Sequence, residues 1–123
     1  MGPPVQILNR QHFYNGNSVF SAGDAAICAY LIQSGHIDIV VGAGDDAVVI
    51  DTLGPGEIFG EMALLDDGVR SASALARDAA TCIVITRTEF QKHLEAADPL
   101  TRAMLKLMTK RLRKVTRLVQ RAA

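Results

Sequence analysis

The sequence lacks several features that would assign it to a function class at once. It has no tryptophan and only four phenylalanines and two tyrosines, fewer aromatics than proteins that stack single-stranded nucleic acids usually need. No apolar run approaches the roughly 20 residues that cross a bilayer. The start, Met1-Gly2-Pro3-Pro4, has neither the basic region nor the long apolar region of a secretory signal. These absences favour a cytoplasmic protein without a transmembrane segment.

Residues that could bind metals or form disulfides are also scarce. Cys28 and Cys82 are the two cysteines, and each lies in an apolar stretch, as reduced core cysteines of cytoplasmic proteins do. His12, His36 and His93 stand alone, whereas a cupin-like metalloenzyme needs clustered ligands such as His-x-His. We therefore predict no disulfide, no metal site and no catalytic residues, so the chain is not expected to be an enzyme. The cupin-like metalloenzyme remains the least favoured alternative.

Acidic residues are absent from the end of the chain. All 13 lie at or before Asp98, whereas eight of the 13 basic residues follow it. The body therefore carries 5 − 13 = −8 charges and the tail carries +8. This split predicts a tail that docks on the acidic body or meets an acidic partner. Contact with DNA or anionic lipid through charge alone is less favoured than a solvated basic face.

Short segments separated by turn residues make up the middle of the chain. His36 to Val41 alternates polar and apolar residues, which is typical of a half-buried strand. Further strands are expected at residues 19–20, 27–32, 47–53, 72–76 and 80–86. The helical segments that βαβ units require are missing there. We predict a mainly β fold with α, an eight-stranded β-barrel or jelly roll over about residues 13–88 flanked by N-terminal and C-terminal helices.

Two helices are expected after the strands, over about residues 89–121. Thr88 is a candidate N-cap for a helix from residue 89 to about 96. Asp98 and Pro99 resemble an N-cap followed by proline at the first helical position. The second helix carries a 3-4-3-4 apolar seam formed by Leu105, Met108, Leu112, Val115 and Val119. This seam predicts either docking on the chain's own barrel or a homodimer. The length favours a single domain over residues 1–123.

The segment 54–72, GPGEIFGEMALLDDGVRSA, combines three features of a binding site. Gly60 precedes a short helix-compatible run, whose free N–H groups can receive an anion. Arg70 follows Glu61 by nine residues, across the turn 66–68, and its guanidinium can donate two parallel hydrogen bonds to the same anion. Glu61 would repel a bare phosphate but would accept a hydrogen bond from a sugar hydroxyl. The combination predicts a site for a phosphate joined to a ribose.

The run Phe59-Gly60-Glu61-Met62-Ala63-Leu64, followed by Arg70-Ser71-Ala72, closely resembles the phosphate-binding cassette of the cyclic-nucleotide-binding family. That family includes the bacterial catabolite activator protein, protein kinase A regulatory subunits and cyclic-nucleotide-gated channels. The resemblance extends from about Phe13 to Leu112 and includes the Gly54-Pro55-Gly56 corner.

The resemblance implies a role for each matching residue. Glu61 would accept the ribose 2′-hydroxyl, and Arg70 would neutralise the cyclic phosphate. Backbone N–H groups near Gly60, Met62, Ala63 and Ala72 would complete the anion site, with Ser71 nearby. Ile39, Ile50 and Leu53 would offer apolar surface to the purine. Lys110, Arg111 and Arg113 are candidates for a lid over the base.

The resemblance also implies a sensor that binds cAMP or, second, cGMP, needs no other cofactor and signals through movement of its C-terminal helices. Ser71 leaves the ligand choice open, because a hydroxyl residue after the arginine can contact a syn guanine and also occurs in cAMP binders of the family. We expect no DNA-binding module in this chain, since the helix-turn-helix of catabolite-activator relatives would follow the long helix. Alternatives are a fragment of a larger transcription regulator or ion channel, or a member whose pocket binds nothing.

Overall fold

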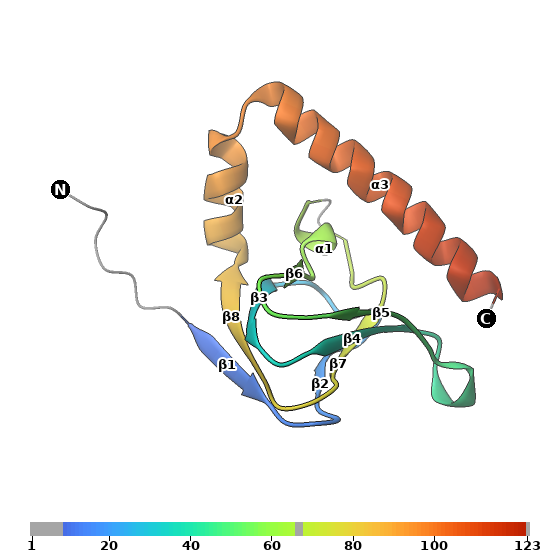
Figure 1. Cartoon of the computed structure of the whole chain (residues 1–123). Coiled ribbons are helices and arrows are strands. Elements are labelled where there is room, and N and C mark those ends of the chain that lie inside the picture. Colours follow the sequence, from blue (N-terminus) through green and yellow to red (C-terminus); the bar gives the residue numbers. More distant parts are fainter. Residues whose placement is uncertain (1–8, 66–67, 123) are drawn as a thin grey trace.

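A computed structural model describes residues 9–65 and 68–122, without the side chains of residues 116 and 119–122. Its strands form two four-stranded antiparallel sheets (Figure 1). The first sheet contains, in spatial order, β1 (Arg10–Phe13), β8 (Ala80–Thr86), β3 (Cys28–Ser34) and β6 (Ile58–Phe59). The second contains β2 (Ser18–Phe20), β7 (Ser73–Ala76), β4 (Ile37–Val41) and β5 (Val48–Leu53). The helical elements are η1 (Gly44–Asp46), α1 (Met62–Leu65), α2 (Arg87–Ala96) and α3 (Pro99–Ala122).

The predicted jelly roll of eight strands is confirmed within the described residues, with one correction. The two sheets stay separate, because no strand of one sheet pairs with a strand of the other, so the barrel is not closed. Two short strands, β1 and β6, were not predicted from the sequence, since β1 is mostly polar and β6 has two residues. Residues 10–13 are strand where an N-terminal helix was expected, and residues 1–8 lie outside the described residues.

Most of the few aromatic residues lie in the core between the sheets. The rings of Tyr30 and Phe59 are stacked with their centroids 5.1 Å apart, and Phe13 meets Tyr30 edge-on. Ile32 and Ile37 complete the core as two of its fully buried side chains. Aromatic side chains bury large areas and stabilise cores accordingly. The core thus holds the two sheets together, and Phe59 links it to the segment 54–72, where the sequence predicts a binding site.

Cys28 and Cys82 are both buried and free, as predicted. A second small cluster of buried residues, Ala26, Ala29, Ala63 and Leu64, lies on the other side of the first sheet and anchors α1. The three alanines of this cluster allow α1 to approach the sheet closely.

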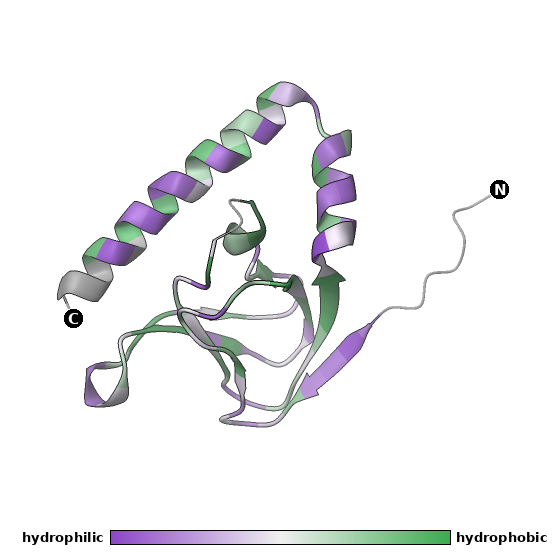
Figure 2. Ribbon diagram, turned by 180° about the vertical axis from the view of Figure 1, so that it is seen from behind, coloured by the Kyte–Doolittle hydropathy of each residue, from purple (hydrophilic) through white to green (hydrophobic). Residues whose placement is uncertain are grey.

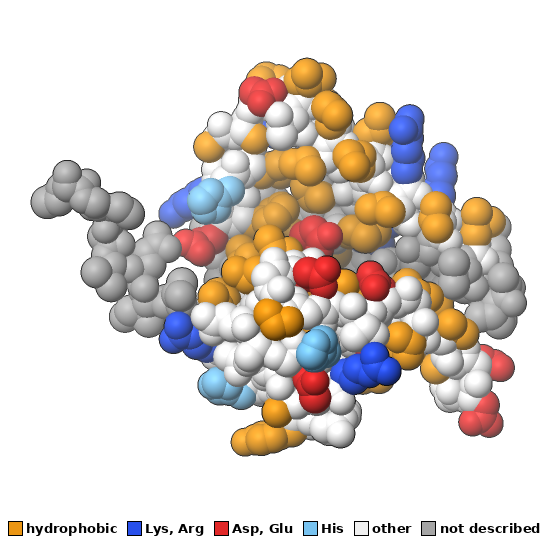
Figure 3. Space-filling model, viewed as in Figure 1, with side chains coloured by type: hydrophobic (Ala, Val, Ile, Leu, Met, Phe, Trp, Pro, Cys, Tyr) orange, Lys and Arg blue, Asp and Glu red, His pale blue; other side chains and the backbone are white. Residues whose placement is uncertain are grey.

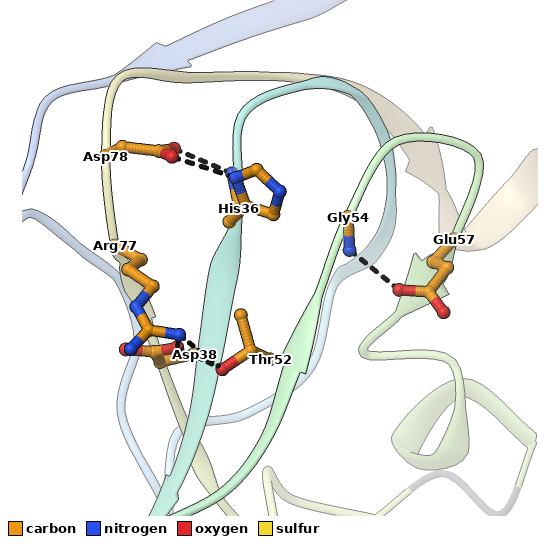
Figure 4. Close-up of polar contacts among 7 residues, drawn as sticks. All are labelled: His36, Asp38, Thr52, Gly54, Glu57, Arg77 and Asp78. Carbon is orange, nitrogen blue, oxygen red and sulfur yellow. Dashed lines mark hydrogen bonds and ion pairs between the residues drawn. The ribbon is translucent and has the colours of Figure 1, made fainter.

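Polar contacts hold the turns on the outer side of the second sheet (Figure 4). Gly35 has φ +80°, and a Cβ there would lie 2.3 Å from the carbonyl oxygen of Ala79, so the turn before β4 requires glycine. The next residue, His36, donates its backbone N–H to Asp78 at 2.7 Å, and its Nδ1 lies 2.8 Å from the same carboxylate. Two turns distant in sequence are thereby joined.

Both C-terminal helices are confirmed, and one predicted cap is wrong. The helix α2 begins at Arg87, and its N-cap is Thr86, whose hydroxyl accepts the N–H of Glu89 at 3.2 Å. Thr88, predicted as the cap, lies in the first turn because β8 runs directly into the helix. The α3 cap is as predicted: Asp98 accepts the N–H of Thr101 at 2.9 Å.

The helix α3 crosses over α1 and contacts α1 and β4 (Figures 1 and 2). Among the described side chains of this helix, Thr109 is buried, with 2% of its surface exposed. The described members of the predicted seam, Leu105, Met108, Leu112 and Val115, are 39% to 57% exposed. The side chain of Val119 lies outside the described residues. Most of the seam is therefore not covered by the chain's own sheets.

Candidate functional site

A cavity of about 380 Å³ lies beneath α3, between α1 and the second sheet. In Figure 3 the surface is hollowed below the hydrophobic side chains of this helix. The cavity is lined by Phe20, Ile39, Ile50, Asp51, Leu53, Ile58, Phe59, Gly60, Glu61, Met62, Ala63, Arg70, Ala72 and Leu112. Its volume lies within the range of sites for small molecules, and its few polar side chains lie among apolar ones.

Arg70 is the most unusual residue of the cavity, because it is a cation that is only 5% exposed. Its Nη1 donates to the carbonyl oxygen of Gly60 at 2.6 Å, and its Nη2 donates to the carbonyl of Cys28. The guanidinium carbon lies 4.1 Å from the centroid of the Phe20 ring, a favourable cation–π distance. No carboxylate of the described residues forms an ion pair with Arg70. Asp24 and Glu61 act on Arg70 electrostatically without forming an ion pair with it. A buried cation that lacks a direct ion pair is costly, so the site is suited to an anion.

The backbone around Arg70 is fixed by a short extended contact. The N–H of Arg70 donates to the carbonyl of Asp24 at 2.8 Å, and its own carbonyl accepts the N–H of Gly23 at 2.8 Å. Val69 pairs with Ala25 in an isolated bridge. This anchoring holds the side chain directed inward, toward the cavity, rather than into solvent. The turn 66–68 predicted before it lies partly outside the described residues, because 66 and 67 are not described.

Gly60 allows the arginine to approach the start of α1. It has φ +80°, and a Cβ at this position would lie 2.7 Å from Nη1 of Arg70 and 3.2 Å from the Phe20 ring. Any other residue would therefore combine an unfavourable backbone conformation with a steric clash. The glycine noted in the sequence is required here by geometry as well as by backbone conformation.

Glu61 is half-buried beside Arg70 and immediately precedes α1. Its carbonyl accepts the N–H groups of Leu64 and Leu65 at 3.0 and 3.1 Å, which closes the first turn. The N–H groups at the start of a helix have no acceptor within the helix. Burial raises the pKa of the Glu61 carboxyl above 4.5, opposed by a backbone hydrogen bond and by Arg70. A partly desolvated carboxylate of this kind favours a ligand that supplies a hydrogen-bond donor.

The structure brings nearly all the predicted ligand-binding residues together. The cavity is lined by Gly60, Glu61, Met62, Ala63, Arg70, Ala72, Ile39, Ile50 and Leu53. Ser71, the tenth, is half-buried and does not line the cavity. These residues come from β4, β5, the start of α1 and the segment before β7.

Five further lining residues were not identified from the sequence. Asp51 could have been found, because it alternates with Leu53 along a strand. Leu112 belongs to the predicted apolar seam of α3. Ile58 and Phe59 directly precede Gly60, so their place next to the cassette was a local signal for them. Phe20 reaches the cavity from β2, far away in the sequence, and local spacing gives no signal for it.

The three lid candidates take different positions on α3. Lys110 and Arg111 are exposed, whereas Arg113 is half-buried and donates to the carbonyl of Val69 at 3.0 Å. The α3 residue that lines the cavity is Leu112. Arg113 therefore ties α3 to the residue that precedes Arg70, and Leu112 places an apolar side chain over the opening.

In the described part of the chain, no three histidine, cysteine or acidic side chains come together in a way that could hold a metal ion. His12 lies on β1 beside Thr81, His36 beside Asp78, and His93 on α2. None of the helices in these described residues combines the length with the hydrophobicity that a membrane-spanning segment needs.

The fold and the site together define a jelly roll with a pocket that is lined by both a buried cation and a carboxylate. The family model described as the cyclic nucleotide-binding domain matches residues 10–97. The chain therefore belongs to the cyclic nucleotide-binding domain family.

Relatives of this chain include the cyclic AMP receptor protein of Thermus thermophilus, which is 32% identical over 89% of this chain and 51% of its own length. The chain thus spans about half the length of this relative. Among solved structures, the EAL enzyme Bd1971 in its cAMP-bound form is 33% identical with a TM-score of 0.82, over 86% of this chain and 28% of that one. The cGMP-bound form of the same enzyme has the same identity and TM-score, over 89% and 29%.

Proposed function

We propose that this chain is a cytoplasmic sensor module that binds cAMP in the cavity beneath α3 and catalyses no reaction. The observation that carries the proposal is Arg70, a buried cation that forms no ion pair within the described residues and lines the same cavity as the carboxylate of Glu61. A cyclic phosphate would supply the missing negative charge, and a ribose 2′-hydroxyl would donate to Glu61. The two buried free cysteines fit a reducing compartment.

The apolar end of the cavity supports a purine as the third part of the ligand. Ile39 and Leu53 lie on adjacent strands on one side of the cavity, and Leu112 approaches from α3. Such surfaces bind aromatic rings through burial of apolar area. We propose cAMP before cGMP because Ser71, the residue that could contact a guanine, does not line the cavity.

The proposed output is a movement of α3. This helix is linked to the site in two ways: Leu112 lines the cavity, and Arg113 donates to the carbonyl of Val69, the residue before Arg70. A ligand that displaces the cassette would change both contacts, so it would bind the two positions of α3 with different affinity. Such a difference is what a ligand needs in order to shift a conformational equilibrium.

We also propose that a second copy of this chain covers α3. Its exposed face carries Leu100, Met104, Leu107, Met108, Val115 and Leu118, and α3 contains no acidic residue. The hairpin β4–β5 has complementary properties, since Asp45 and Asp46 lie at its tip and Val48 and Val49 are exposed. Light scattering should report a dimer that Met108→Lys dissociates, whereas Lys110→Ala, on the basic face of the same helix, should leave it intact. A monomeric wild-type chain at high concentration would refute this arrangement.

The experiment that tests the binding function is a calorimetric titration of the chain with cAMP, cGMP and 5′-AMP. Saturable binding of cAMP, weaker binding of cGMP and far weaker binding of 5′-AMP are expected, because the linear nucleotide carries more charge and a different shape at the phosphate. Absence of binding by both cyclic nucleotides would contradict the proposal. Since the chain spans about half of its cyclic AMP receptor relative, a role within a larger regulator is part of the same proposal.

A further inference from the structure

The cavity contains a second carboxylate, Asp51, at its apolar end. Glu61 and Asp51 together carry two negative charges, whereas Arg70 is the one cation among the lining residues of the described chain. An anionic ligand adds further negative charge. Asp51 lines the cavity and is itself exposed, so its carboxylate faces both the cavity and the solvent, and the phosphate end of the site gives it no role.

The strand register directs Asp51 toward the cavity. Its Cα partner on β4 is Ile39, and the next pair on the same side is Leu53 with Ile37, a core residue that is 0% exposed. Side chains directly opposite each other project on the same face of a sheet. The intervening pair, Asp38 and Thr52, lies on the outer face, where Thr52 Oγ1 donates to Asp38 at 2.7 Å (Figure 4). Asp51 is thus on the ligand side of β5.

The carboxylate of Asp51 is held in place by its neighbour. One oxygen accepts the backbone N–H of Thr52 at 2.9 Å. The second oxygen has no hydrogen-bond partner within the described part of the chain. The side chain therefore offers one oriented hydrogen-bond acceptor to the cavity, whereas Arg70 offers hydrogen-bond donors.

An ionised carboxylate accepts hydrogen bonds and donates none. Adenine carries a donor, the amino group, at its six position, whereas guanine carries an acceptor, the carbonyl O6. A carboxylate beside the six position would accept from the first and repel the second. We propose that Asp51 contacts the six position of the purine and makes the site selective for adenine, an inference that rests on the proposed function.

Titration with a matched pair of nucleotides tests this assignment. Cyclic inosine monophosphate has the six-carbonyl of guanine without its two-amino group, so it isolates the six position. Wild type should bind cAMP about tenfold more tightly than the inosine nucleotide, as expected for one hydrogen bond to a charged group. In Asp51→Asn the ratio should fall to about one, because the amide can donate to a carbonyl. Glu95→Gln also removes one negative charge, at an exposed position of α2 away from the cavity, and should leave the ratio unchanged.

Three other outcomes overturn the proposal. A ratio that is equal in wild type and in Asp51→Asn shows that Asp51 does not read the base. Tighter binding of cGMP than of cAMP by wild type, lost in Asp51→Asn, shows contact with the N1–H and two-amino edge instead. If wild type binds none of the nucleotides, the proposed function itself is wrong and this assignment falls with it, whereas the first two outcomes leave cyclic-nucleotide binding intact.

Discussion

The segment 54–72 and the helix α3 lie on two sides of one cavity, yet the chain fixes them in different ways. In the segment, Arg70 is 5% exposed and bound to two backbone carbonyls, and Gly60 has no room for a Cβ. In α3, Thr109 is buried, while eight large hydrophobic residues from Leu100 to Leu118 are 39% to 69% exposed. The segment 54–72 is held in place by contacts with the rest of the chain, whereas α3 presents an uncovered apolar face.

This difference indicates a division of roles. A preorganised anion site contributes affinity because its groups are already ordered before the ligand arrives. A helix with few contacts to the rest of the chain can change position at low cost, since it breaks little packing when it moves. Binding in the segment and response in α3 are therefore compatible within one small fold. Substitutions on each side should separate the two roles.

Replacement of Arg70 should have the largest effect. Arg70→Ala should weaken cAMP binding by about 2–5 kcal/mol, as for other truncated buried charge pairs, because the phosphate would lose its one buried counter-charge. Isothermal titration calorimetry measures the change. Arg77→Ala removes an equal charge from an exposed residue and should bind cAMP like wild type. Since Arg70→Ala also leaves two carbonyls without a donor, a melting curve must show that the variant is folded. Unchanged affinity in a folded variant would remove Arg70 from the site.

Glu61→Gln should change stability and binding in opposite directions, because it removes a partly buried charge and with it a charged hydrogen-bond acceptor for the ligand. The pKa of Glu61 is raised above 4.5 mainly by burial, so the folded chain holds the neutral form more favourably than the unfolded chain does. Its contribution is fully present below the ordinary carboxyl range and is lost as pH rises through the raised pKa. At pH 7 the variant should therefore melt at a higher temperature than wild type, and the difference should shrink toward pH 4. Glu95→Gln, at an exposed position, should show neither effect. A lower melting temperature for Glu61→Gln at pH 7 would contradict the account.

The same variant should bind cAMP about tenfold to 150-fold more weakly, because a hydrogen bond to a charged group contributes roughly 1.5–3 kcal/mol. Titration with 2′-deoxy-cAMP identifies the group involved. Wild type should discriminate against the deoxy nucleotide, and Glu61→Gln should discriminate far less. Equal discrimination by both proteins would mean that Glu61 does not contact the 2′-hydroxyl.

On the side of α3, the expected effect is the smallest. Leu112 is 51% exposed, so Leu112→Ala should weaken cAMP binding by about threefold to tenfold, in keeping with partial burial of a leucine. Leu118→Ala, a matched change on the same helix outside the cavity, should not alter affinity. An equal loss in both variants would point to the stability of α3 rather than to contact with the ligand.

Local sequence patterns predicted the parts of this molecule that depend on local chemistry. The alternation in 36–41, the Asp98 cap and the cassette from Gly60 to Ala72 were all readable because each is set by neighbouring residues. Strand β1 escaped prediction because Arg10, Gln11 and His12 are polar edge residues stabilised by pairing with β8, 70 or so positions away.

The same limit applies to the site. Phe20 supports Arg70 across a separation of 50 residues, and no spacing rule connects the two positions. The α2 cap was misplaced by two residues because Thr86 and Thr88 are equally good N-caps, and the end of β8 decides between them. The lid could not be assigned, since the tertiary position of α3 determines which of its residues meets the cavity.

The most direct test of the central claim is a crystal structure of the chain with cAMP. The account predicts that the Arg70 guanidinium lies within about 3 Å of the cyclic phosphate oxygens, and that the Glu61 carboxylate accepts the 2′-hydroxyl of the same molecule. A nucleotide bound elsewhere, or bound in this cavity with its phosphate away from Arg70, would contradict it.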